Sequence, residues 1–95
     1  MSGYDRRVSE MLQLRSEGLE WRDVGGDVVV LDLDGGRYFA VNGSGAVLFS
    51  SLVDGATREQ LSERLTEKFA IDRNVADGDV ESFLATAREY RFLEA

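Results

Sequence analysis

Two glycine-rich turns divide the stretch from residue 19 to residue 42 into three short runs that favour β-strands. The turns are Gly25-Gly26 and Asp34-Gly35-Gly36, and the runs are 19–24, 27–33 and 36–42. β-Branched and aromatic residues are frequent in the runs, and short turns of this composition join neighbouring strands into antiparallel hairpins. The sequence therefore predicts a three-stranded antiparallel sheet in chain order, with 27–33 as the central strand.

Alternation along the strands predicts which side chains face a core, because residues two apart on a strand lie on the same face. The expected core-facing set is Val29, Leu31, Leu33, Phe39 and Val41. Tyr38 and Ala40 then point the other way, toward solvent or a partner.

The two outer strands of this sheet differ in their charges. The first strand carries Glu20, Arg22 and Asp23. Charged side chains at a sheet edge discourage pairing with other chains, and the third strand carries only one, Arg37. The edge of the third strand is therefore predicted to be a docking edge for a peptide.

Helical spacing replaces alternation after residue 42. Asn42 or Ser44 is the expected N-cap of a first helix through 46–53, and Asp54-Gly55 ends it. The order of a sheet followed by helices places the domain in the α+β class.

A second helix is predicted to begin at Thr57, because Thr57 and Gln60 have the spacing of a capping box. Its apolar residues recur every four positions, which is the spacing of one helix face. The residues of this face, expected in the core, are Leu61, Leu65 and Phe69.

A third helix is predicted from about Val75 to Arg91. Its first turns are expected to hold Asp77, Asp79 and Glu81, where carboxylates stabilise the positive end of the helix dipole. One apolar band follows, made of Val80, Phe83, Leu84 and Ala87. The band is wide enough to face both the core and a groove, and the sequence leaves open how it is divided. Phe92 and Leu93 are expected to close the domain.

Residues 1–18 precede the strands and carry no strand pattern. Tyr4, Val8, Met11 and Leu12 fall at helical spacing, which leaves open a short helix or an arm. We divide the chain into this N-terminal arm and one domain, 19–95. Three antiparallel strands followed by three helices is an order that yields a winged helix-turn-helix.

Composition excludes several classes of function. The chain has no cysteine and no histidine, so the usual nucleophiles, bases and zinc ligands are missing. We therefore expect no enzymatic activity, no catalytic residue and no cofactor. The net charge of −7 disfavours nucleic acid as a partner. No apolar run approaches the roughly 18 residues of a membrane span and no secretion signal stands at the N-terminus, so we expect a cytoplasmic protein without a membrane partner.

Two acidic stretches begin like calcium-binding loops. The stretch from Asp32 has Arg37 where such a loop needs glycine, and Gly43 where it needs a closing carboxylate. The stretch from Asp72 has Asp77 and Phe83 at the same two positions. We interpret the first as a hairpin turn and the second as a helix start, and we predict no metal site.

Several short segments have a characteristic order and spacing: Val29–Leu33, Gly36–Asn42, Gly45, Leu48, Asp54–Thr57 and Asp79–Leu84. Together they resemble the PqqD-like proteins, also called precursor peptide or RiPP recognition elements. The resemblance covers about residues 19–94. The Gly-Arg-Tyr-Phe strand and the chain length are most similar to the stand-alone leader-binding subunit of lasso peptide biosynthesis. The chain departs from the pattern at Arg91-Phe92-Leu93, where a glycine often precedes a final Leu-Leu.

The resemblance implies a winged helix-turn-helix that binds no DNA. It implies that the third strand takes the leader segment of a ribosomally made precursor peptide as an additional antiparallel strand, beside the third helix. The peptide-binding residues so implied are Arg37, Tyr38, Phe39, Ala40, Val41, Val80, Phe83, Leu84, Ala87 and Arg88. Arg37 and Arg88 are expected to pair with acidic leader residues.

The resemblance also implies partners. The subunit would act as a peptide chaperone in antibiotic biosynthesis, delivering the leader to a separate transglutaminase-like leader peptidase before a lasso cyclase acts on the core peptide. Catalysis would then lie in those partners.

Two other functions stay open on the residues alone. The open edge would also allow two copies to pair, as in a small regulatory or structural subunit. A DNA-binding regulator is less favoured, because Asp77, Asp79 and Glu81 would stand near the start of its recognition helix and repel phosphates.

Overall fold

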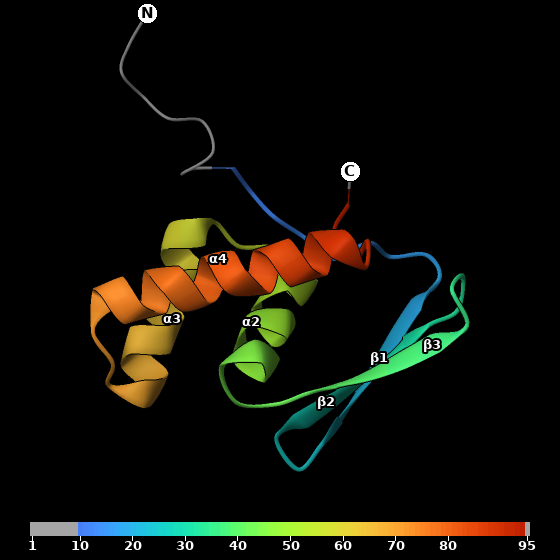
Figure 1. Cartoon of the computed structure of the whole chain (residues 1–95), viewed down its shortest axis with the longest axis horizontal. Coiled ribbons are helices and arrows are strands. Elements are labelled where there is room, and N and C mark those ends of the chain that lie inside the picture. The colour runs from blue at the N-terminus through green and yellow to red at the C-terminus, as the bar shows by residue number, and fades with distance from the viewer. Residues whose placement is uncertain (1–9, 95) are drawn as a thin grey trace, which may run out of the picture.

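The computed structural model describes residues 10–94 as a three-stranded sheet followed by three helices (Figure 1). The elements are β1 (Leu19–Val24), β2 (Asp27–Asp32), β3 (Arg37–Val41), α2 (Gly43–Asp54), α3 (Arg58–Phe69) and α4 (Arg73–Glu89). The strands lie in the order β1-β2-β3, and both neighbouring pairs are antiparallel. Figure 1 shows α4 running across α2 and α3, with the sheet to the right of the helices in this view. The predicted fold class is confirmed.

β2 buries the face opposite to the one predicted. Val28 and Val30 are buried, whereas Leu31 is 42% and Leu33 56% exposed. Val29 and Leu31 lie on the outer face of the sheet, and Leu33 follows the end of the strand. The prediction that Val29, Leu31 and Leu33 face the core is therefore wrong.

The prediction is wrong because the face that β2 buries carries a charged residue, Asp32, as its third side chain. Its side chain is only 4% exposed, and a carboxylate is buried at tolerable cost only when it is paired and hydrogen-bonded. Asp32 accepts hydrogen bonds from Arg15 at 3.0 Å and from Arg37 at 3.3 Å. These partners come from outside β2, so the alternation within the strand gave no sign of them.

The faces of β3 are as predicted. Phe39 and Val41 pair with Val30 and Val28 of β2 and pack against the core. Tyr38 points to the outer face of the sheet, where it is 74% exposed.

Residues 10–18 form an extended arm that packs into the domain. Leu12 makes an isolated β-bridge with Ala56, and Leu14 makes another with Leu93. Both leucines are buried. Of the two alternatives for this segment, residues 10–18 therefore adopt the arm, whereas Tyr4 and Val8 lie outside the described residues. The folded unit includes the arm from Leu12 onward.

The start of α3 follows its predicted capping box. The Thr57 side chain accepts a hydrogen bond from the backbone N–H of Gln60 at 3.1 Å, and the Gln60 side chain accepts one from the backbone N–H of Thr57 at 3.0 Å. α2 begins after Asn42, one of its two expected caps, whose side chain makes no capping hydrogen bond.

α4 begins earlier than predicted, after the N-cap Asp72. Its first turn therefore contains no acidic residue, and the expectation that Asp77, Asp79 and Glu81 stand there is wrong. Asp77 instead accepts hydrogen bonds from Ser62 of α3 at 2.6 Å and from Arg73 at 2.9 Å. These bonds, the one from Ser62 first, lower the pKa of Asp77.

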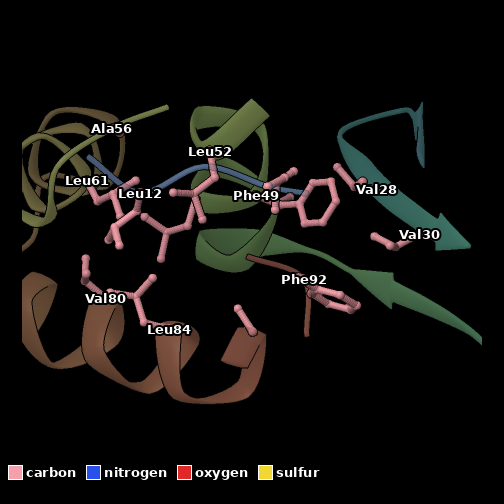
Figure 2. Packing of buried hydrophobic residues seen from close by; sticks show 14 of the residues in the cluster. Leu12, Val28, Val30, Phe49, Leu52, Ala56, Leu61, Val80, Leu84 and Phe92 are labelled. Atoms are coloured by element: carbon pink, nitrogen blue, oxygen red, sulfur yellow. The ribbon is translucent and has the colours of Figure 1, made fainter. Parts of the chain in front are cut away.

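One hydrophobic core joins the sheet to the helices. In Figure 2, Phe49 of α2 lies next to Val28 of β2 and to Phe92, while Leu52 and Leu84 continue the core between the helices. The ring of Phe49 packs edge-on against Phe92, with centroids 6.1 Å apart. Among residues 10–94, no helix has the length and apolarity needed to cross a membrane.

Phe69 is the exception to the predicted core of α3. Leu61 and Leu65 are fully buried, but Phe69 is 40% exposed. Phe69 is the last residue of α3, and Ala70 ends the helix in the left-handed conformation at φ 55°. The last turn of the helix therefore extends past the core.

The chain reverses direction at Arg91, after α4 has ended at Glu89. Arg91 has φ 60°, in the left-handed region that costs a residue other than glycine about 1 kcal/mol. This is the position at which the resemblance described above leads one to expect glycine. The reversal buries Phe92 and brings Leu93 beside Leu14, so the last residues close the domain as predicted.

Candidate functional site

The outer edge of β3 is an open strand backbone. β3 pairs with β2 on one side, and within residues 10–94 no strand pairs with its other side. Arg37 is the only charged residue of β3, whereas the opposite edge, β1, carries three. The structure thus confirms the predicted difference between the two edges.

A glycine brings α2, β3 and α4 together at one end of this edge. A Cβ atom placed on Gly45 of α2 would lie 2.8 Å from the Cγ1 of Val41 and 3.8 Å from the Phe83 ring. The lack of a side chain at Gly45 therefore lets Val41 and Phe83 both pack close to α2. Phe83 is partly buried against the core and keeps some exposed surface beside β3.

Aromatic rings join the other end of β3 to the end of α4. The Phe39 ring lies 4.6 Å from the Tyr90 ring and 5.3 Å from the Phe92 ring, between centroids. The guanidinium carbon of Arg37 lies 5.6 Å from the Phe39 centroid and 5.1 Å from the Tyr90 centroid, within the range of a cation–π contact. Apolar side chains from Phe83 to Tyr90 thus lie between β3 and α4; we call this apolar surface the groove.

A buried carboxylate fixes Arg37 at this end. The backbone N–H of Gly35 donates to Asp32 at 3.0 Å, and this bond is the main reason that the pKa of Asp32 lies below its usual range. Burial acts in the opposite direction, and the guanidinium groups of Arg37 and Arg15 lower the pKa further. Asp32 is therefore ionised at neutral pH and connects the arm, the second hairpin turn and β3.

The structure separates the predicted site residues into distinct environments. Arg37 to Val41 form the open edge, with Phe39 and Val41 toward the groove and Tyr38 and Ala40 on the outer face. Phe83 is the member of the predicted α4 band that lies beside β3.

The other predicted residues of α4 do not line the groove. Val80, Leu84 and Ala87 are at most 1% exposed and belong to the core. Arg88 borders a hollow on the side of the arm, together with Leu12 and Glu94. Arg37 and Arg88 are thus not brought together.

Sequence reasoning missed several residues around the groove: Arg15, Asp32, Gly45, Tyr90 and Arg91. Gly45 gave no signal, because the predicted helix began at residue 46, whereas α2 begins at Gly43 and contains Gly45. The pairing of Asp32 with Arg15 joins residues 17 apart in the chain and had no local signal.

The chain matches the family of coenzyme PQQ synthesis protein D (PqqD) over residues 27–93. Its fold is also that of two solved structures. One is TbiB1 in complex with the TbiA(beta) leader peptide, with TM-score 0.80 and 24% identity over 87% of this chain and 95% of that chain. Another is lasso peptide synthetase B1 complexed with the leader peptide, with TM-score 0.76 and 21% identity over 88% of this chain and 98% of that chain. No curated protein gives a significant match.

Proposed function

The chain belongs to the PqqD family, and on this premise we propose that it is a RiPP recognition element that binds the leader segment of a ribosomally synthesised precursor peptide. The leader adds an antiparallel strand to the outer edge of β3. The proposed contact residues are the strand Arg37–Val41 and the α4 residue Phe83.

The observation that carries this proposal is the open edge of β3 beside an apolar groove. Strand addition supplies backbone hydrogen bonds that tolerate many sequences, while alternate side chains of the peptide give selectivity. Side chains that point toward α4 meet Val41, Phe83 and Tyr90. Those that point the other way lie next to Tyr38 on the outer face.

The matched structures support the same class of ligand. Both are of proteins bound to a leader peptide. The fold they share with this chain includes a sheet whose last strand, β3, has no partner on its outer edge among residues 10–94.

Delivery is the second part of the proposal. The chain presents the bound leader to a separate transglutaminase-like leader peptidase, and a lasso cyclase acts on the core peptide afterward. The chain itself supplies binding and no catalysis, for which it lacks histidine and cysteine. The proposed location is the cytoplasm, where ribosomes make the precursor.

The experiment that tests leader binding is fluorescence anisotropy. The leader half of the precursor that we expect to be encoded beside this chain is labelled and titrated with the protein, with the core half and a DNA duplex as controls. Saturable binding of the leader alone is the expected result. A folded protein that binds none of the three would overturn the proposal.

A second copy of the chain is the competing occupant of the open edge. Light scattering at several concentrations measures the mass with and without leader. We expect a monomer that forms a one-to-one complex. A dimer that leader does not dissociate would place the β3 edge in a homodimer interface instead.

A further inference from the structure

The groove beside β3 ends in a basic hollow of about 420 Å³ at Arg37. Its charged and aromatic lining residues are Arg15, Arg37, Arg91, Tyr90, Asp32 and Asp34. Three guanidinium groups thus meet two carboxylates in a chain whose net charge is −7. The hollow therefore carries a positive charge, whereas the chain as a whole is negative.

The two carboxylates of the hollow are already paired. Asp32 accepts from Arg15 and Arg37, and Asp34 accepts from Arg15 at 3.0 Å. The side chain of Arg91, in contrast, makes no hydrogen bond or ion pair within residues 10–94. Arg91 is therefore the guanidinium that the hollow offers to an external anion.

The backbone holds Arg91 in place. Its N–H donates to the carbonyl of Arg88 at 3.1 Å, and its carbonyl accepts from the Nε of Arg15 at 2.6 Å. Arg91 also keeps a left-handed conformation that glycine would adopt without strain. A strained residue that the surrounding structure fixes this firmly is an observation from which a functional role can be inferred.

The direction of an added strand determines which part of a leader reaches the hollow. β3 runs from Arg37 to Val41, so an antiparallel partner has its C-terminal end beside Arg37. The leader residues that follow the paired segment therefore pass Arg91.

We propose that this hollow reads an aspartate or glutamate of the leader just C-terminal to the segment paired with β3. Arg91 donates hydrogen bonds to that carboxylate, and Arg37, oriented by Asp32 and Tyr90, contributes a second positive charge. Charge-assisted bonds from a planar guanidinium suit a carboxylate better than a neutral side chain. The inference rests on the proposed function and adds a charge requirement and a direction to it.

The test compares two variants that remove one positive charge each. Arg91→Gly removes the guanidinium at a position where glycine relieves strain, so the fold is retained and thermal unfolding verifies it. Arg88→Gln is the matched control, because Arg88 lines a separate hollow beside the arm, which Arg91 also borders, and does not line the basic hollow. We expect Arg91→Gly to weaken leader binding about 10-fold and Arg88→Gln less than 2-fold.

The peptide side of the test uses leaders in which one acid is replaced by its amide. Replacing the acid C-terminal to the paired segment should weaken binding to the wild type about 10-fold and to Arg91→Gly less than 2-fold, as expected for two groups in contact. Replacing an acid on the N-terminal side should have no effect.

Three outcomes would overturn the inference while leaving the proposed function in place. The first is that Arg91→Gly binds leader no more weakly than Arg88→Gln. The second is that replacing the N-terminal acid weakens binding and replacing the C-terminal one does not. The third is that the leader that binds has no acid on its C-terminal side. A wild-type protein that binds no leader would instead remove the proposed function itself.

Discussion

The two sides of α4 are covered to very different degrees. On the side toward α3, Val80 and Leu84 are at most 1% exposed, and polar pairs border the contact. Arg58 lies 2.7 Å from Glu81, and Ser62 donates to Asp77. On the side toward β3, the partly buried Phe83 faces a glycine and the end of β3, whose outer edge has no partner strand within residues 10–94.

This difference indicates that one side of α4 serves stability and the other serves peptide binding. The side of α4 toward α3, which we call the closed side, fixes α4 against α3. The side toward β3, which we call the open side, therefore keeps its shape when no peptide is bound. A site that is formed in advance loses less conformational entropy on binding. Substitutions on the closed side should therefore change stability, and substitutions on the open side should change binding.

The largest expected effect is on the closed side. Leu84→Ala should lower the free energy of unfolding by about 3 kcal/mol, because it removes a fully buried side chain and leaves a cavity. Urea unfolding measures the loss, and Ser82→Ala at an exposed position of the same helix is the control. The fraction that remains folded should bind leader with unchanged affinity. A weaker affinity without a loss of stability would contradict the assignment of the closed side to stability.

On the open side, Phe83→Asp should weaken leader binding by about 30-fold or more, the effect of removing a central apolar contact. The exposed part of Phe83 allows the charge to reach water, so the variant should stay folded. Anisotropy measures the affinity, and circular dichroism verifies the fold. A variant that unfolds would place Phe83 in the core and not in the groove.

The sequence predicted the order of elements and the open edge well, because these depend on local signals. The glycine turns, the capping box at Thr57 and the single charge of β3 are all read within a few residues. The buried face of β2 was not predicted, since Val29, Leu31 and Leu33 outnumber the apolar residues on the other face. Burial of Asp32 depends on Arg15 in a segment that shows no secondary-structure pattern.

The same limit applies to α4. Its apolar spacing identifies a buried stripe, but the side on which Arg88 lies depends on how the arm packs against the helix. Val80, Leu84 and Ala87 repeat at core spacing, whereas Phe83 differs from them only by its angle around the helix. The assignment of individual residues to core or groove therefore required the three-dimensional structure.

Acidic pH should destabilise the protein at the start of β3, where Asp32 binds Arg37. The folded pKa of Asp32 is lowered, mainly by the Gly35 N–H, while the unfolded pKa is roughly 3.9. A lowered carboxyl pKa stabilises the fold above the unfolded pKa, and this contribution is lost as pH falls through the folded pKa. Urea unfolding between about pH 4 and pH 2 should therefore show a steeper loss for the wild type than for Asp32→Asn. Parallel pH profiles for the two proteins would refute the role of Asp32.

The smallest expected effect tests whether the open side depends on the close approach at Gly45. In Gly45→Ala the new Cβ would lie 2.8 Å from the Val41 Cγ1, so Val41 must move toward the groove. Alanine also favours a helix over glycine by roughly 1 kcal/mol, which offsets part of the strain. We expect the free energy of unfolding to stay within about 1 kcal/mol of the wild type, while leader affinity falls about 3-fold to 10-fold.

Gly78→Ala is the matched control for this last prediction. Gly78 also lies in a helix, α4, but a Cβ there meets no atom within 4 Å. The control should gain roughly 1 kcal/mol of stability from helix propensity and bind leader as the wild type does. If both alanine variants bind equally well, the groove does not depend on the close approach of Val41 to Gly45. If only Gly45→Ala binds weakly, the open side of α4 is shaped by a residue of α2 that has no side chain of its own.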